Sequence, residues 1–164
     1  MDTPDLRTER LRLRRYRPED FGFFARLFGD PEVVRYSSSG LLAPEQARAL
    51  FDKVFGVYAE GRFAVWCVTL DDEPIGHAEL KPRAGEEGLE LVYFLDPSRW
   101  GQGCGTEVVD ALTRHGETLT PRLLATVAPG NAASIRLLRK AGFAFLRQVE
   151  EADGPCAYYE RRKA

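Results

Sequence analysis

Hydrophobic residues recur along this chain at two spacings, one typical of strands and one typical of helices. Leu11 and Leu13 alternate with three arginines, which predicts a half-buried strand whose arginine face is solvated. Between residues 44 and 58 the apolar positions stand three or four residues apart, as on one side of a helix. Read in this way, the chain is predicted to form helices at 18–29, 44–58, 107–117 and 131–141. The predicted strands are 10–14, 62–70, 74–82, 89–95, 122–127, 143–150 and 155–161.

The order of these elements indicates a mixed α/β sheet. Only three polar residues, Asp71 to Glu73, join the second predicted strand to the third, so these two strands should form an antiparallel hairpin. The fourth strand is apolar on both faces apart from Glu90, which predicts a central position in the sheet. We therefore expect a single domain over residues 1–164. It should hold a mostly antiparallel sheet of about six to seven strands and about four helices.

A glycine-rich stretch follows the central strand and leads into the helix predicted at 107–117. Its sequence is Trp100-Gly101-Gln102-Gly103-Cys104-Gly105-Thr106. Glycines at alternate positions let the backbone turn tightly and leave its N–H groups uncovered by side chains. The start of a helix adds unpaired N–H groups and the positive end of its dipole. This junction therefore predicts a phosphorylated ligand, such as a nucleotide or coenzyme A.

Several known kinds of phosphate-binding loop are rich in glycine, and the spacing of the glycines distinguishes between them. A Walker A loop ends in Gly-Lys-Ser/Thr, and no lysine follows here. A dinucleotide loop has G-x-G-x-x-G after the first strand of the unit, whereas this chain has G-x-G-x-G after the fourth. The pyrophosphate loop of GNAT acyltransferases has Gln/Arg-x-x-Gly-x-Gly/Ala after the fourth strand, and Gly103 and Gly105 match its two small positions. A tight strand-to-helix turn without a ligand is the remaining alternative.

Motifs along most of the chain decide between these alternatives. In order they are Thr8–Arg14, Pro31-Glu32-Val33, Pro74-Ile75-Gly76, Trp100–Gly103 with Thr106-Glu107, and Asn131-x-x-Ser134 with Lys140–Phe143. From about Thr8 to Tyr159 the chain thereby resembles the RimJ/RimL-like branch of the GNAT N-acetyltransferase superfamily. The resemblance implies the GNAT fold, in which the fourth and fifth strands splay apart. It also implies acetyl-CoA as cosubstrate, with its pantetheine arm in the slot between those strands.

The resemblance also implies which residues bind the cosubstrate. Backbone amides of Gly101, Gln102, Gly103, Cys104, Gly105 and Thr106 should hold the pyrophosphate. Backbone groups of Val92, Tyr93, Phe94 and Leu95 should pair with pantetheine like an added strand. Asn131 should contact the pantetheine arm and Ser134 should lie near the sulfur, although Asn131 would also suit a helix N-cap and Ser134 could simply face that cap. Cys104 is expected to be a small residue packed at the helix start rather than a nucleophile.

Acetyl transfer to an amine needs a neutral amine, a polarised carbonyl and a stabilised leaving thiolate. Glu90 is the first candidate base, because burial in the central strand would raise its pKa and bring it near the thioester. The alternative is a carboxylate at the wet end of the sheet, and Glu79 is the reserve candidate. Leu138 stands where many family members carry a tyrosine that acts as the general acid. Ser134, Tyr93 or an ordered water could protonate the thiolate instead, or the thiolate could leave without a proton. An isolated histidine more often has a structural role than a catalytic one, so we expect structural roles for His77 and His115.

The composition argues against some classes of binding partner but does not identify a substrate. The net charge of −2 and pI near 5.8 give no general attraction to nucleic acid or to an anionic membrane. Three cysteines with no CxxC pair argue against a disulfide framework and a zinc site, so we expect no metal and a reducing cytoplasmic location. Neither a secretory leader nor a long apolar run is apparent. Homodimers are common among similar proteins, but the sequence marks no interface.

Two classes of function stay open. The first is an acetyl-CoA-dependent N-acetyltransferase acting on a primary amine, either a protein N-terminus or a small molecule. The second is a catalytically idle acyl-CoA-binding sensor, for which the missing tyrosine at Leu138 leaves room. We expect the segment 37–42 and the second helix to help form the wall of the acceptor site.

Overall fold

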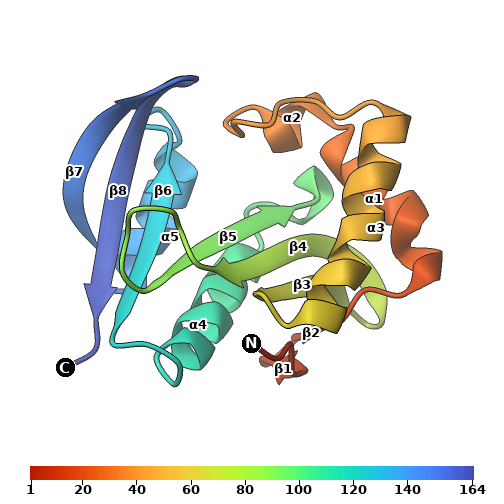
Figure 1. The fold of residues 1–164 in the computed structure, drawn as a ribbon, viewed down its shortest axis with the longest axis horizontal. Coiled ribbons are helices and arrows are strands. Elements are labelled where there is room, and N and C mark those ends of the chain that lie inside the picture. Colours follow the sequence, from red (N-terminus) through yellow and green to blue (C-terminus); the bar gives the residue numbers. More distant parts are fainter.

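One eight-stranded sheet runs through the molecule, in the order β1-β2-β3-β4-β5-β6-β8-β7 (Figure 1). This structure is a computed structural model that describes residues 1–164. The strands are β1 (Leu6–Arg7), β2 (Leu11–Arg14), β3 (Ala64–Leu70), β4 (Glu73–Lys81), β5 (Leu89–Leu95), β6 (Arg122–Val127), β7 (Ala144–Glu151) and β8 (Gly154–Arg162). The α-helices are α1 (Phe21–Phe28), α2 (Pro31–Val34), α3 (Pro44–Glu60), α4 (Cys104–Gly116) and α5 (Ala132–Lys140). All neighbouring strands are antiparallel except β5 and β6, which are parallel.

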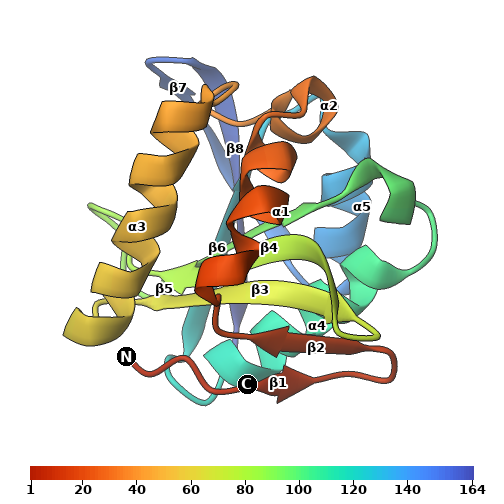
Figure 2. The same cartoon turned by 90° about the vertical axis from the view of Figure 1, so that its right-hand side faces the viewer.

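Helices cover both faces of the sheet and create two hydrophobic cores. In Figure 2, α1 and α3 cross in front of the strands, whereas α4 lies behind them. Trp66 of β3 points to the α4 side, while its neighbours Val65 and Cys67 pack among the aromatic residues of α1 and α3. Because successive strand residues point to opposite faces, a central strand covered on both sides must be apolar throughout. The sequence of β3, AVWCVTL, meets that requirement except at Thr69, whose buried hydroxyl donates to the Arg12 carbonyl at 2.9 Å.

The predicted α/β architecture is confirmed, with one strand and one helix more than expected. The additional strand, β1, has two residues, and the additional helix, α2, has four. Elements this short hold too few residues to show a hydrophobic period. Asp30 nevertheless caps α2, because its side chain accepts a hydrogen bond from the Glu32 N–H at 2.9 Å. The antiparallel hairpin of β3 and β4 is as predicted.

Arg14 does not lie on a solvated face, which corrects the prediction for the first strand. It is 5% exposed, and its guanidinium binds both carboxylate oxygens of Asp20, over 2.7 and 3.0 Å. Asp20 Oδ2 also accepts the Arg17 N–H at 2.7 Å, at the start of the turn that leads into α1. Burial alone would raise the pKa of Asp20, but the hydrogen bond and charge of Arg14 outweigh it and lower that pKa.

Replacing Asp20 by alanine should lower the free energy of unfolding by about 3–5 kcal/mol, because it leaves a buried guanidinium without its partner. Urea unfolding at neutral pH measures this. Asp52→Ala is the matched control, since the Arg48–Asp52 pair is exposed and its loss should cost at most about 1 kcal/mol.

The Arg14–Asp20 pair should stabilise the wild type fully above the ordinary carboxyl pKa of about 4. That stabilisation should be lost as the pH falls through the lowered pKa of Asp20. Equal losses in the two variants would contradict the assignment.

Candidate functional site

β5 and β6 separate after two residue pairs and leave a slot between them (Figure 1). They pair only at Leu89 with Leu123 and at Glu90 with Leu124, although β5 continues to Leu95 and β6 to Val127. The splay that the family resemblance implied is therefore present. A cleft of about 1250 Å³ occupies this opening and is lined by residues of both strands, the glycine loop, α3 and α5.

Beyond its short pairing with β6, the edge of β5 that faces the slot has no strand partner, and alternate residues direct their backbone groups into the slot. The Asp96 N–H donates to the Ile75 carbonyl of β4 at 2.8 Å, so the even-numbered residues of β5 direct their backbone groups toward β4. Leu91, Tyr93 and Leu95 consequently direct theirs toward the slot, where the Leu95 carbonyl accepts the Trp100 indole N–H at 3.0 Å. Within the predicted stretch 92–95, this leaves Tyr93 and the Leu95 N–H to pair with an extended ligand.

The glycine loop beside the slot has the geometry of an anion site. Gly101 and Gly103 have positive φ angles of 69° and 85°, which favour glycine, and Gly103 is the N-cap of α4. The helix begins at Cys104, three residues earlier than predicted. No backbone N–H from Gly101 to Thr106 donates a hydrogen bond within the chain. These free donors and the positive end of α4 fit a pyrophosphate.

The loop residues contribute in different ways. Gly101, Gly103, Gly105 and Thr106 line the cleft, whereas Gln102 and Cys104 do not. The Gln102 side chain donates to the Ser98 carbonyl at 2.8 Å, and Cys104 packs in the core at 1% exposure. Only the main chain of these two residues is therefore available to a ligand, and the expectation that Cys104 packs at the helix start is confirmed.

The start of α5 brings two hydroxyl groups together at the slot. Asn131 accepts the Ser134 N–H at 3.2 Å and so caps the helix, and both residues also line the cleft. The Ser134 hydroxyl lies 2.5 Å from the Tyr93 hydroxyl. Burial raises the pKa of Tyr93, and the hydrogen bond to Ser134 offsets this only in part, so the phenol stays protonated at neutral pH. Leu138 is buried in the core and offers no proton.

Glu90 lies where β5 and β6 part, and the structure excludes a solvent-exposed position for it. It is 3% exposed and lines the cleft. The Arg83 guanidinium lies 3.2 and 3.3 Å from its two carboxylate oxygens, and Thr126 donates to Oε1 at 2.5 Å. A carboxylate has about four acceptor positions, so Oε2 keeps one for a further donor. Neither partner was visible in the sequence pattern.

The reserve candidate Glu79 belongs to a chain of polar side chains on the same face of the sheet. Tyr16 Oη lies 2.8 Å from His77 Nδ1, His77 Nε2 lies 2.9 Å from Glu79 Oε1, and Lys81 Nζ lies 2.9 Å from Glu79 Oε2. Burial would raise the pKa of Glu79, but His77 and then Lys81 lower it to about 2. Oε1 is bound by His77, whereas Oε2 is ion-paired with Lys81 but has no hydrogen-bond partner. His77 therefore has hydrogen-bonding partners on both nitrogens, and it also lines the cleft.

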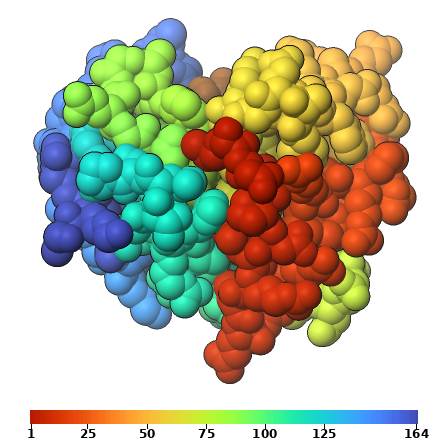
Figure 3. All heavy atoms as spheres, turned by 60° about the horizontal axis from the view of Figure 1, so that its bottom comes forward, coloured from red at the N-terminus to blue at the C-terminus, as the bar shows by residue number.

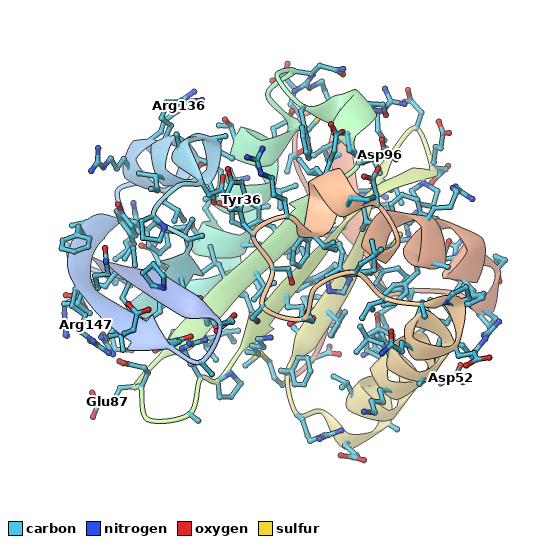
Figure 4. All side chains as sticks on the ribbon, turned by 90° about the horizontal axis from the view of Figure 1, so that it is seen from above. Tyr36, Asp52, Glu87, Asp96, Arg136 and Arg147 are labelled. Carbon is cyan, nitrogen blue, oxygen red and sulfur yellow. The ribbon has the colours of Figure 1, made fainter.

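The segment between α1 and α3 closes one wall of the cleft. Ser37, Ser38 and Ser39 line it as expected, together with Leu50 and other residues of α3. Leu41 is instead exposed and Leu42 packs against the aromatic core. Tyr36, which the sequence did not single out, donates to the Gly130 carbonyl at 3.3 Å and so bridges to the loop before α5. Figure 4 shows Tyr36 beside α5, next to the loop that follows α2.

Other kinds of site are not seen. No three His, Cys, Asp or Glu side chains are grouped so that they could hold a metal ion. No helix combines the length and the apolar character needed to cross a membrane. The three cysteines are free thiols.

Known proteins match the chain over most of its length. The profile of the acetyltransferase (GNAT) domain matches residues 10–144. An uncharacterized N-acetyltransferase, p20 of Bacillus licheniformis, is 34% identical, and the match covers 91% of this chain and 89% of the relative. RimL, a ribosomal L7/L12 α-N-protein acetyltransferase solved with coenzyme A, superposes with a TM-score of 0.83 at 16% identity over 97% of this chain and 98% of its own. The aminoglycoside acetyltransferase AAC(6')-Ib, also solved with coenzyme A, gives a TM-score of 0.78 at 21% identity, with coverages of 93% and 95%. The chain therefore belongs to the GNAT acetyltransferase family, and it is an enzyme whose cosubstrate is acetyl-CoA.

Proposed function

We propose that this protein is an N-acetyltransferase that transfers the acetyl group to a primary amine by direct attack on the thioester. The observation that carries the proposal is the position of Glu90, a buried carboxylate that lines the cleft where β5 and β6 part. A carboxylate binds an ammonium group and accepts its proton, so it suits an amine acceptor. The alternative of an idle acyl-CoA sensor has no support in these observations.

The residues of the slot divide the work of holding acetyl-CoA. The free N–H groups from Gly101 to Thr106 hold the pyrophosphate, and the backbone of Tyr93 with the N–H of Leu95 holds the pantetheine arm. When bound, acetyl-CoA would supply an activated acetyl group to the amine, and CoA would be released as the thiol. A free N–H on the slot edge of β5 is placed to polarise the carbonyl. Asn131 and Ser134 border the same arm.

Glu90 binds the acceptor amine and accepts its proton. Arg83 and Thr126 keep its carboxylate in place, and Oε2 retains an acceptor position toward the amine. Glu79 remains the reserve base, and in that case His77, which is hydrogen-bonded to it, would relay the proton that Glu79 takes from the amine. Because His77 and Lys81 lie against the carboxylate of Glu79 and lower its pKa to about 2, Glu90 is the better candidate.

We propose that the Tyr93–Ser134 pair protonates the departing thiolate in place of the tyrosine absent at Leu138. Ser134→Ala and Tyr93→Phe should each lower kcat by about 100-fold, at the low end of the range for general acid catalysis, and leave the KM for acetyl-CoA near the wild-type value. Because the two hydroxyls act as one unit, the double variant should be little worse than either single variant. Steady-state kinetics measure this. Unchanged kcat in both single variants would return the pair to a packing role.

The kind of amine is tested by thiol release from acetyl-CoA with a panel of acceptors. The panel contains peptides with free N-termini, amino acids, a polyamine and an aminoglycoside. Amine-dependent thiol release, with a mass increase of one acetyl group on the acceptor, supports the proposal. Binding of acetyl-CoA without thiol release for any amine would favour the sensor.

We also propose that residues 1–164 act as one domain in a reducing cytoplasm, where the free cysteines would persist.

A further inference from the structure

The N-terminal segment contacts the start of α4, although the two lie about one hundred residues apart in sequence. Figure 3 shows this segment, in red, side by side with the green-blue residues of α4. Glu107, in the first turn of α4, is the centre of the contact. Its Oε1 accepts the Thr8 hydroxyl at 2.7 Å and the Arg10 N–H at 3.0 Å, and its Oε2 accepts Arg10 Nε at 2.6 Å. Burial would raise the pKa of Glu107, but these hydrogen bonds lower it and keep the carboxylate charged.

Arg10 connects this contact to the glycine loop. While its Nε binds Glu107, its Nη2 donates to the Gln102 carbonyl at 2.9 Å. In a trans peptide the C=O and the following N–H point in opposite directions. Holding the Gln102 carbonyl toward Arg10 therefore turns the Gly103 N–H to the opposite side. Gly103 lines the cleft, whereas Arg10 does not.

Glu107 also fixes the loop through its own backbone. Its N–H donates to the Gly103 carbonyl at 3.2 Å, which closes the first turn of α4. Glu107 thus holds the Gly103 carbonyl directly through its main chain and the Gln102 carbonyl indirectly, through the Arg10 side chain that it binds. Neither Thr8, Arg10 nor Glu107 lines the cleft, so none of them is placed to touch the cosubstrate.

We propose that Thr8, Arg10 and Glu107 form a positioning clamp that sets the backbone of the glycine loop for binding the phosphates of acetyl-CoA. The clamp acts on acetyl-CoA through the loop and does not contact it. This explains an otherwise unfavourable arrangement. A carboxylate in the first turn of α4 stabilises the helix but repels a phosphate bound at the same helix end.

Glu107→Gln tests the clamp, because two explanations predict opposite changes. If Glu107 acted only through its charge, removing that charge would tighten the binding of acetyl-CoA. If it positions the loop, the new amide nitrogen would face the donors of Arg10, the loop would loosen, and the Kd should rise about tenfold. Calorimetry with acetyl-CoA on the folded variant measures the Kd, and kcat at saturating acetyl-CoA should stay near the wild-type value.

Two further variants keep the test independent of helix stability. Asp110→Asn removes an equal charge from an exposed position on the same helix and should leave the Kd unchanged. Thr8→Val removes the hydroxyl that binds Glu107, whereas Thr8→Ser keeps it. The valine variant should bind acetyl-CoA more weakly, and the serine variant should bind like the wild type. Equal or tighter binding by Glu107→Gln, or equal binding by the two Thr8 variants, would overturn the proposal.

Discussion

Gly103→Val should weaken acetyl-CoA binding by about 100-fold while leaving a folded protein. Gly103 has a φ of 85°, a region that β-branched residues rarely adopt. A Cβ at this position would also lie 3.0 Å from Arg10 Nη2, the group that holds the Gln102 carbonyl. The valine side chain would therefore displace the loop backbone and cover the N–H groups that the pyrophosphate needs. The effect should appear in the Kd and in the KM for acetyl-CoA, with a smaller change in kcat.

Gly85→Val is the matched control for backbone strain. Gly85 also has a positive φ, of 78°, but nothing lies within 4 Å of its added Cβ, and it does not line the cleft. Both variants should therefore lose stability through strain, while only Gly103→Val should lose affinity. Thermal unfolding and calorimetry on the same samples separate the two effects. Unchanged affinity in folded Gly103→Val would show that the loop is a turn without a phosphate.

Glu90→Gln should lower turnover by about 10² to 10⁴-fold, the range expected when a general base is removed. The amide cannot take a proton from the amine, although it keeps the shape of the side chain. Acetyl-CoA affinity should change little, because Glu90 lies away from the glycine loop and acts on the acceptor amine. Turnover with the best amine of the panel, together with the Kd for acetyl-CoA, measures both parts of this expectation.

Glu151→Gln is the control for Glu90, since Glu151 binds the same Arg83 guanidinium at 2.8 Å but does not line the cleft. It should keep near wild-type turnover, which would show that disturbing Arg83 is not the cause of the loss. Glu79→Gln completes the set. Normal turnover in Glu90→Gln together with a large loss in Glu79→Gln would transfer the role of base to Glu79 and its neighbour His77.

Several parts of the fold could be predicted because the signal is local. The limits of β5, Leu89 to Leu95, follow from an apolar run that only Glu90 interrupts and that Gly88 and Asp96 bound. Gly142 has a φ of 84° just after α5, as expected of a glycine beyond a helix C-terminus. The first turn of α4 was missed, because Cys104 and Gly105 follow glycines and show no helical period of their own.

The site itself was only partly predictable, because its contacts join residues far apart in sequence. The glycine loop and Glu90 were visible as unusual residues in an apolar or helical context. The partners of Glu90, Arg83 and Thr126, come from a loop and from another strand, so no local pattern indicates them. Arg14 stands in an alternating pattern that predicts a solvated position. It is buried instead, because Asp20 pairs with it and neutralises its charge. The splay leaves no trace in hydrophobic periodicity, since the residues beyond the last pair of β5 and β6 are mostly apolar on both strands, as they would be if the strands stayed paired.

Calorimetric titration with acetyl-CoA tests the central claim, that the slot between β5 and β6 and the loop from Gly101 to Thr106 hold this cosubstrate. CoA and NADH are the comparators, because both carry a pyrophosphate but only CoA has a pantetheine arm. We predict binding of acetyl-CoA and CoA with a Kd of roughly micromolar magnitude, near −8 kcal/mol, and no comparable binding of NADH. The absence of any acetyl-CoA binding by a folded sample would contradict the account.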